Sequence, residues 1–164
     1  MTTASTEKNP STGLTVEVFG PTVEFLTTES GFSVLKGVVP PGVFVPMHSH
    51  PDVEDFIVIA GEMQCLKQET ESHEWITAKV GDYIHVPGNA RHAWRNASNE
   101  PAILLIITTN KMEQFFRESG RSIDGTLQLP TPEELGKLAA ISAKYGYWLA
   151  TPEENAAVGI HFSF

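Results

Sequence analysis

The sequence predicts an all-β fold, a barrel or a sandwich, followed by C-terminal helices, in a single domain of 164 residues. About ten short apolar or alternating runs precede residue 109, and glycine or proline interrupts most of the gaps between them. After residue 110 the apolar residues recur with a helical period instead. We expect a mobile lead over residues 1–14, a barrel over 15–109, and a helical tail over 110–164 that packs on the barrel or on a dimer partner.

Strands are expected where apolar or β-branched residues lie between turn-forming residues. The polar segment 68–74 then forms the tip of a hairpin. The predicted strands are residues 15–19, 23–27, 32–39, 43–45, 56–60, 63–67, 75–80, 83–86, 92–95 and 102–108.

Helix-start signals occur at three places in the tail. Asn110 with Glu113 predicts the N-terminal cap of a helix that ends at Gly120. The motif Thr-Pro-Glu-Glu occurs at 131–134 and again at 151–154, and each copy places a capping threonine before proline with a glutamate three residues later. We expect a helix after the first copy and a shorter one after the second.

The composition excludes several classes of partner. The chain carries 20 Asp and Glu against 11 Lys and Arg, a net formal charge of −9, and its basic residues are not clustered. Nucleic acid and anionic membrane surfaces need clustered positive charge, so neither is an expected partner. The single cysteine, Cys65, allows no intramolecular disulfide. The N-terminus lacks the apolar core of a signal peptide and no run approaches a membrane span, so we expect a soluble, cytoplasmic protein.

Two histidines and a glutamate lie within seven residues of one another. In an extended strand His48 and His50 project from the same face, so both imidazoles point one way. Glu54 could not join them on a straight strand, but Pro51 and Asp52 favour a bend that lets the chain double back. Glu54 would then face the histidines from the start of the next strand.

A fourth ligand candidate, His92, follows a strand and a Pro-Gly-Asn turn at 87–89. Three imidazoles and one carboxylate suit first-row transition metals and leave positions free for substrate or oxygen. We expect one divalent ion per chain, and Fe, Mn, Ni, Co, Cu and Zn all accept these ligands. The alternative is that the histidines bond to one another without metal, which would leave a buried carboxylate unneutralised. The expected metal ligands are His48, His50, Glu54 and His92.

The spacing of these residues resembles that of the cupins. The first cupin motif is Gly, five residues, His-x-His, three or four residues, Glu, six residues and Gly. It is matched by Gly42, His48, His50, Glu54 and Gly61.

The second cupin motif is Gly, five residues, Pro-x-Gly, two residues, His, three residues and Asn. Gly81, Pro87, His92 and Asn96 match it. Asn89 stands where the second glycine is usual, and asparagine is the non-glycine residue that best tolerates a left-handed backbone.

The tail extends the resemblance, because a helix with Phe-Phe-Arg-Glu at 115–118 and a second helix at 132–145 follow the barrel. This order is similar to that of single-domain bacterial cupins related to quercetin 2,3-dioxygenase, over most of residues 30–150. The resemblance implies the cupin double-stranded β-helix, a jelly-roll barrel, with the metal ligands named above. It also favours a homodimer.

The leading hypothesis is a metal-dependent dioxygenase that acts on a small aromatic or enolisable, flavonol-like substrate, with dioxygen as a further partner. The metal would bind the deprotonated substrate oxygen. The resemblance implies that Glu54 is the catalytic base that removes the substrate proton. Two alternatives stay open: a non-oxidative isomerase, cyclase or decarboxylase that uses the ion as a Lewis acid, and a non-catalytic cupin that binds a small molecule.

Three large side chains near the ligand residues are candidates for the substrate pocket. Phe56 shares the strand face of Glu54, and Trp94 shares that of His92. These two and Met47 either wall the pocket or belong to the barrel core. Whether His85, on the strand before Pro87, reaches the pocket is left open by the sequence.

Overall fold

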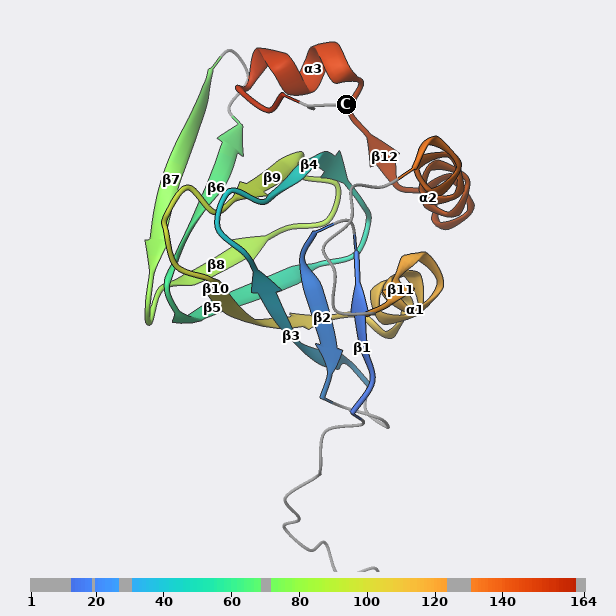
Figure 1. Cartoon of the computed structure of the whole chain (residues 1–164), viewed down its shortest axis with the longest axis horizontal. Coiled ribbons are helices and arrows are strands. Elements are labelled where there is room, and N and C mark those ends of the chain that lie inside the picture. The colour runs from blue at the N-terminus through green and yellow to red at the C-terminus, as the bar shows by residue number, and fades with distance from the viewer. Residues whose placement is uncertain (1–12, 19, 27–30, 69–71, 124–130, 162–164) are drawn as a thin grey trace, which may run out of the picture.

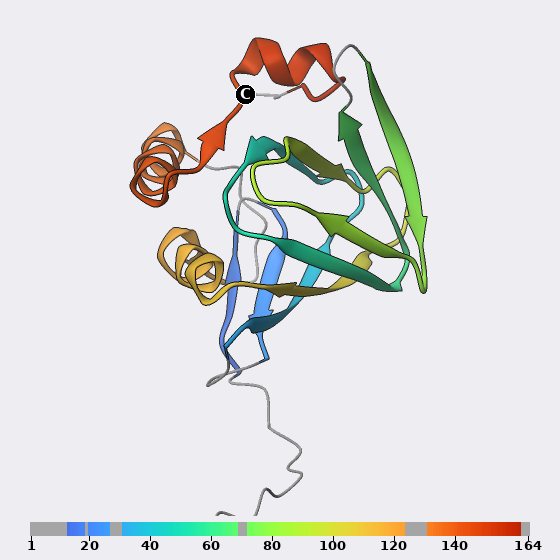
Figure 2. The same cartoon turned by 180° about the vertical axis from the view of Figure 1, so that it is seen from behind.

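The computed structural model describes residues 13–18, 20–26, 31–68, 72–123 and 131–161. Its strands form two antiparallel sheets that enclose a barrel, with helices beside it and above it (Figure 1, Figure 2). This arrangement confirms the predicted all-β fold with C-terminal helices. Of the predicted mobile lead, residues 1–12 lie outside the described part of the chain, as do residues 69–71 of the predicted hairpin tip.

The two sheets contain seven and five strands. In spatial order, the larger sheet consists of β11 (Arg121–Ser122), β1 (Thr15–Glu17), β2 (Thr22–Phe25), β3 (Ser33–Val39), β10 (Ala102–Thr108), β5 (Glu54–Ala60) and β8 (Tyr83–Val86). The smaller sheet consists of β12 (Trp148–Leu149), β4 (Phe44–Ser49), β9 (His92–Arg95), β6 (Glu62–Gln68) and β7 (His73–Lys79).

Each predicted strand is present, and the differences lie at strand ends. β4 continues to Ser49, and β5 already begins at Glu54, so both strands run up to the histidine motif. The short strands β11 and β12 were not predicted, because two residues cannot show a period. β12 pairs with β4 so that Leu149 lies opposite His48.

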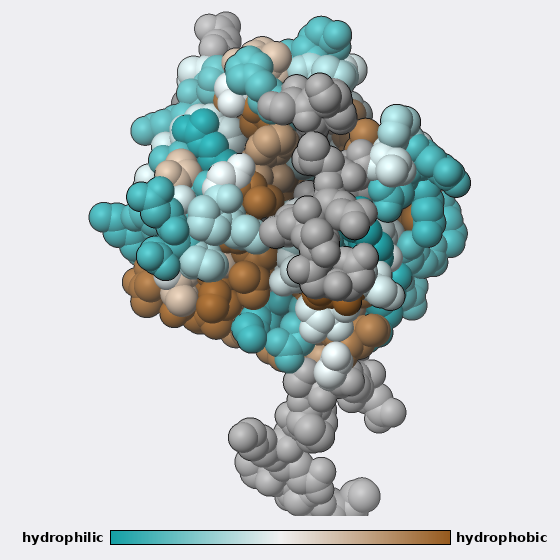
Figure 3. Space-filling view, viewed as in Figure 1, coloured by the Kyte–Doolittle hydropathy of each residue, from teal (hydrophilic) through white to brown (hydrophobic). Residues whose placement is uncertain are grey.

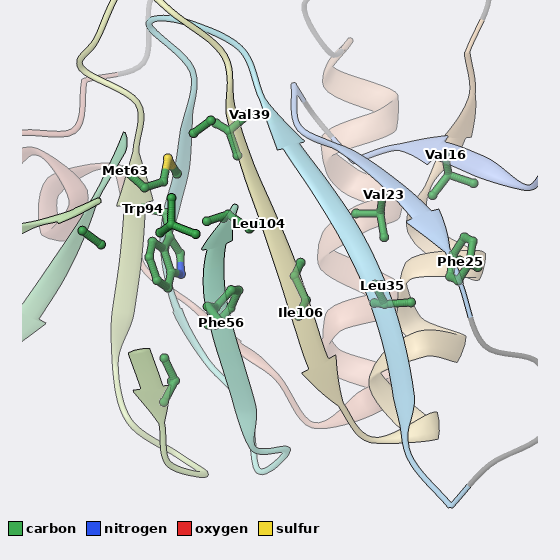
Figure 4. Packing of buried hydrophobic residues seen from close by; sticks show 14 residues of the cluster. Val16, Val23, Phe25, Leu35, Val39, Phe56, Met63, Trp94, Leu104 and Ile106 are labelled. Atoms are coloured by element: carbon green, nitrogen blue, oxygen red, sulfur yellow. The ribbon is translucent and has the colours of Figure 1, made fainter. Parts of the chain in front are cut away.

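The core lies between the two sheets and is built by strict alternation. In β3 and β10 every second residue is buried, and Leu35 of β3 is paired with Ile106 of β10. Figure 4 shows these side chains, with Phe56 and Trp94, in the interior between the sheets. Burying one such side chain contributes about 1.5–3 kcal/mol, so the core fixes the strands that carry the histidines.

Helix α1 (Asn110–Ser119) follows β10 directly and begins one residue earlier than predicted. The N-cap is Thr109, not Asn110, because Thr109 has the extended backbone that a cap requires. Its hydroxyl accepts a 3.1 Å hydrogen bond from the backbone N–H of Met112. Asn110 is instead the first residue of the helix, which corrects the predicted cap.

Helices α2 (Pro132–Tyr145) and α3 (Pro152–Ala157) begin as predicted. Thr131 and Thr151 each form a capping box with the glutamate three residues later. α1 and α2 pack around a cluster that includes Met112, Phe115 and Tyr147, whereas the chain after α3 packs near β4. None of the helices in the described residues has the length and hydropathy of a membrane span.

Candidate metal centre

The predicted ligand residues converge between the two sheets. His48 of β4 is paired with His92 of β9, His50 follows β4, and Glu54 begins β5. One ring nitrogen of each histidine lies within 4.8 Å of the other two. Oε2 of Glu54 lies 3.2 Å from Nε2 of His50 and 3.6 Å from Nε2 of His92. Because two nitrogens on opposite sides of one ion lie about 4.2 Å apart, small adjustments let this group hold a single ion.

The turn of the second motif holds the first motif in place. The backbone N–H of Asn89 donates a 2.6 Å hydrogen bond to the carbonyl oxygen of His50. A Cβ on Gly88 would lie 2.5 Å from the carbonyl oxygen of Pro51, so only glycine allows this approach. Asn89 has a φ of 66°, the left-handed conformation expected at this position. The two motifs are therefore held together by direct contacts between their backbones.

Backbone carbonyl groups orient all three imidazoles. Nδ1 of His48 lies 2.7 Å from the carbonyl oxygen of Pro46, and Nδ1 of His50 lies 2.8 Å from that of Asp52. Nδ1 of His92 makes the same contact at 2.9 Å with the carbonyl oxygen two residues before it. A carbonyl oxygen only accepts, so each Nδ1 carries the hydrogen, and in a neutral ring each Nε2 keeps its lone pair.

The hydrogen bonding of the Nε2 atoms shows whether a metal ion fits the site. Nε2 of His50 and Nε2 of His92 are buried and have no hydrogen-bond partner among the described residues. Buried polar atoms are rarely left unpaired, because the missing interaction costs about 1–3 kcal/mol. Lone-pair nitrogens beside a carboxylate are the donor set that a divalent transition metal takes, so these residues fit such an ion.

Electrostatics distinguish the ligand candidates. Burial, with the neighbouring His92 and His50, lowers the pKa of His48 to about 3, so this ring is neutral at pH 7. Burial raises the pKa of Glu54, but His50 and His92 outweigh this and lower it to about 2. Burial lowers the pKa of His50, whereas nearby Glu54 raises it more, and the net change is upward from 6.5. Glu54 therefore favours the protonated form of His50, whereas His48 stays neutral.

A cavity of about 100 Å³ adjoins the site. His48 and Glu54 lie in its wall, which is otherwise mostly apolar. Phe56 and Trp94, two of the three residues predicted to wall a pocket, both line it, and their ring centroids are 4.5 Å apart (Figure 4). The interior of the barrel thus connects an apolar space to the ligand residues.

Met47, the third predicted pocket residue, does not line this cavity. It is buried in a separate cluster with Leu66, Ala93 and Val158. Neighbouring strand residues point to opposite faces, so Met47 points away from the cavity that His48 lines. Of the two roles left open for Met47, pocket wall or core, its position in this cluster fits the core role.

His85 also lies away from the cavity. Its Nδ1 is 2.7 Å from Oδ1 of Asp55, and its side chain is 50% exposed. The hydroxyl of Tyr83 donates a 2.6 Å hydrogen bond to the same oxygen. Tyr83, His85 and their hydrogen bonds lower the pKa of Asp55. This polar group belongs to the outer surface of β5 and β8.

Two residues that the sequence analysis did not assign to the site support His50. The carboxylate of Asp52 accepts a 2.7 Å hydrogen bond from the hydroxyl of Tyr147 and another from that of Thr109. The rings of Tyr147 and His50 lie 5.3 Å apart. In the sequence Asp52 is only a turn former and Tyr147 only an aromatic residue that is costly to expose, and no local pattern links them.

Comparisons with known proteins agree with this geometry. Residues 36–108 match the family described as "Cupin domain". Quercetin 2,3-dioxygenase from Bacillus subtilis (strain 168) is 28% identical over 109 residues, which covers 66% of this chain and 31% of that protein. The chain therefore spans less than a third of the length of this relative.

A solved structure shows the same fold at lower identity. Oxalate decarboxylase from Bacillus subtilis, a protein with Mn(II) centres, superimposes with a TM-score of 0.51 at 22% identity. The match covers 58% of this chain and 27% of that chain. Residues 36–108, which carry both motifs of the site, therefore match a cupin domain, and the chain resembles quercetinase-like proteins.

Proposed function

We propose that the protein is a metal-dependent enzyme that uses dioxygen to oxidise a small enolisable or aromatic substrate. The observation that carries the proposal is the group of three imidazoles, each held at Nδ1 by a backbone carbonyl, with Glu54 beside it and an apolar cavity next to it. The likeness to quercetin 2,3-dioxygenase favours oxygen chemistry over other cupin reactions.

His48, His50 and His92 would bind one divalent transition metal through Nε2, with Glu54 as the carboxylate ligand. When bound, such an ion supplies Lewis acidity and open coordination positions. The backbone carbonyls at Nδ1 keep the rings in the tautomer that binding needs. The ion is one of Fe, Mn, Ni, Co, Cu or Zn, since the donor set accepts all of them.

Glu54 is the one carboxylate among the described residues that line the cavity, so we assign it the role of general base. A pKa of about 2 keeps the carboxylate ionised, which is the form that accepts a proton. The same low pKa makes it a weak base. The substrate proton must therefore come from an acidic enol or hydroxyl group, not from an unactivated C–H bond.

The walls of the cavity also contribute to the proposed reaction, because they exclude water from the site. Phe56 is 5% exposed and Trp94 is 4% exposed, so both side chains exclude water beside His48 and Glu54. Excluding water strengthens the electrostatic interactions inside the site and protects reactive species from hydrolysis. These walls hold the apolar part of the substrate while its oxygen faces the ligand residues.

Metal analysis followed by oxygen-electrode measurements tests the proposal. The purified protein is analysed for metals, stripped, reloaded with each of the six ions, and supplied with short enolisable ketones, catechols and flavonols. We expect about one ion per chain and oxygen uptake with at least one pair of ion and substrate. Product formation without oxygen uptake would assign the site to a Lewis-acid reaction, and binding without any product would assign it to a binding protein.

We also propose that the protein is a homodimer joined through the outer face of β10 and β5. The outward residues of β10 are Ile103, Leu105 and Ile107, so this strand is apolar on both faces. Ile59 of β5 is 46% exposed. Figure 3 shows hydrophobic residues gathered at the lower left, over the region of β5 and β10 in Figure 1. Strands that are apolar on both faces are typically covered on both, here by a second copy.

A further inference from the structure

We infer that the substrate is a short enol or hydroxycarbonyl compound whose remaining part is uncharged and apolar, and that Gly37 and Trp94 set its maximum size. The inference rests on the proposed function, because it concerns the substrate of the same site. It narrows the flavonol-like expectation to molecules with a single small apolar group beside the oxygen that faces His48 and Glu54.

The volume of the cavity is the first reason. The space beside His48 and Glu54 is about 100 Å³. A protein cavity of about 150 Å³ takes up one benzene molecule, and pockets for drug-sized ligands span about 300–1,000 Å³. A three-ring flavonol therefore exceeds this space several-fold. At the benzene ratio of about 25 Å³ per non-hydrogen atom, an apolar group of about four non-hydrogen atoms fills it.

The chemistry of the walls is the second reason. Among the described lining residues, the polar side chains are Thr22, His48 and Glu54, and none is a lysine or an arginine. A carboxylate on the substrate, away from the oxygen that faces His48 and Glu54, would have no lysine or arginine of the cavity wall to pair with. Burying it unpaired is costly. The part of the substrate that lies beyond the ligand residues is therefore uncharged and apolar.

Trp94 limits the depth of the cavity. Its ring contacts Phe56 at 4.5 Å between centroids, and Met63, which is 1% exposed, lies in the same wall (Figure 4). These three side chains belong to three different strands, so they close the space from several sides. A smaller ring at position 94 would open room along the same direction without removing a ligand residue.

Gly37 keeps the opposite wall open. It lies in the interior of β3 with its Cα facing inward, between the buried residues Leu35 and Val39. A Cβ there would lie 3.1 Å from Cδ1 of Ile106 and 4.0 Å from Cβ of Leu104, both cavity residues. Its backbone is not in the left-handed region, so conformation does not require glycine. Glycine in a strand interior marks a place where another group approaches closely, here the side chain of Ile106, so a Cβ at position 37 would displace that side chain and alter the cavity wall.

A binding assay on the Co(II)-loaded protein tests the inference without relying on turnover. Hydroxamates bind metals through two oxygens as an enediolate would, so acetohydroxamate, butanohydroxamate and benzohydroxamate form a size series. Dissociation constants are read from the Co(II) absorption bands for the wild-type protein, for Gly37→Ala and for Trp94→Phe. Gly136→Ala and Trp75→Phe are the matched controls, because neither residue lines the cavity.

Wild-type protein should bind acetohydroxamate at least about tenfold more tightly than benzohydroxamate. Gly37→Ala should weaken butanohydroxamate binding about tenfold with little change for acetohydroxamate, whereas Trp94→Phe should strengthen benzohydroxamate binding about tenfold. The controls should reproduce the wild-type series. Equal affinity of the wild-type protein for the smallest and largest hydroxamates would overturn the size limit alone. A protein that binds no Co(II) would overturn the proposed function together with the inference.

Discussion

The hydroxyl of Tyr147 donates a 2.7 Å hydrogen bond to Oδ2 of Asp52, two residues after the ligand candidate His50. The backbone carbonyl of the same aspartate accepts the hydrogen on Nδ1 of His50. Tyr147 follows α2, so this contact ties the C-terminal tail to the ligand loop of the barrel. The tail therefore positions the ligand candidate His50 indirectly, through the hydrogen bonds of Asp52.

Tyr147→Phe should reduce both stability and metal affinity. The change removes a donor from the buried Asp52 carboxylate, which should lower the free energy of unfolding by about 1–3 kcal/mol. Loosening the loop should weaken metal binding about tenfold, in the range found for residues that orient metal ligands. Chemical denaturation and metal titration measure the two effects. Tyr145→Phe is the control, because Tyr145 donates to the exposed Glu118 instead; equal effects of both variants would refute the positioning role.

His50→Ala and His92→Ala should each abolish stoichiometric metal binding. Each variant removes one of three converging nitrogens, and the remaining two with Glu54 bind an ion far more weakly. Metal content after gel filtration in metal-free buffer measures the loss. His73→Ala should retain the ion, because His73 is exposed on β7. Retention of a full equivalent by either ligand variant would contradict the assignment.

Metal affinity should fall as the pH falls from 8 to 6. Protons and metal compete for Nε2 of His50, whose pKa is raised from 6.5 by Glu54 against the opposing effect of burial. His48 does not compete in this range, because its pKa is about 3, and Glu54 stays ionised because its pKa is about 2. Below the pKa of His50, the affinity should decrease about tenfold per pH unit from this proton. Competition titrations at several pH values measure the affinity, and a constant affinity over this range would contradict the assignment of His50 as a ligand.

Local spacing explains why the fold and the ligand set could be predicted from the sequence. Strand alternation, turn residues and the capping threonines act within a few residues of one another, so the ten main strands and both Thr-Pro-Glu-Glu helix starts are confirmed. The distances between His48, His50 and Glu54 follow from one strand, one bend and the next strand. Spacing along the chain does not predict how closely His92 approaches them. Its residue type and the turn before it made it a candidate ligand, and the resemblance implied the shared site.

Contacts between distant segments explain what could not be predicted. The bond between Tyr147 and Asp52 and the pairing of β12 with β4 join residues far apart in the sequence, and neither has a periodic signal. Met47 is different. Alternation along β4 already puts it on the face opposite His48, so the choice between its two open roles, pocket wall and core, could have been made from the sequence.

Leu105→Glu should convert the proposed dimer to monomers. Leu105 is at the centre of the outer row of β10, opposite Lys36 of β3. The ammonium of Lys36 already pairs with Glu24 at 3.2 Å, so burying a further carboxylate there in an interface would be costly. Light scattering coupled to gel filtration gives the mass. Ile76→Glu is the control, since Ile76 is 40% exposed on β7 of the other sheet and should not change the mass. A wild-type protein that elutes as a monomer at high concentration would exclude the proposed interface.

Glu54→Gln should separate proton transfer from metal binding. The amide keeps the shape of the side chain but cannot act as a base, so kcat should fall by about 10²–10⁴-fold. Three histidines remain, so the variant should still bind an ion at saturating metal, and kcat is compared at equal metal content.

Asp55→Asn is the matched control, because Asp55 is the next residue along β5 and faces outward toward His85. Its activity should stay near that of the wild-type protein. A Glu54→Gln variant with full metal and full kcat would show that the substrate loses its proton elsewhere, since no other carboxylate of the described residues lines the cavity.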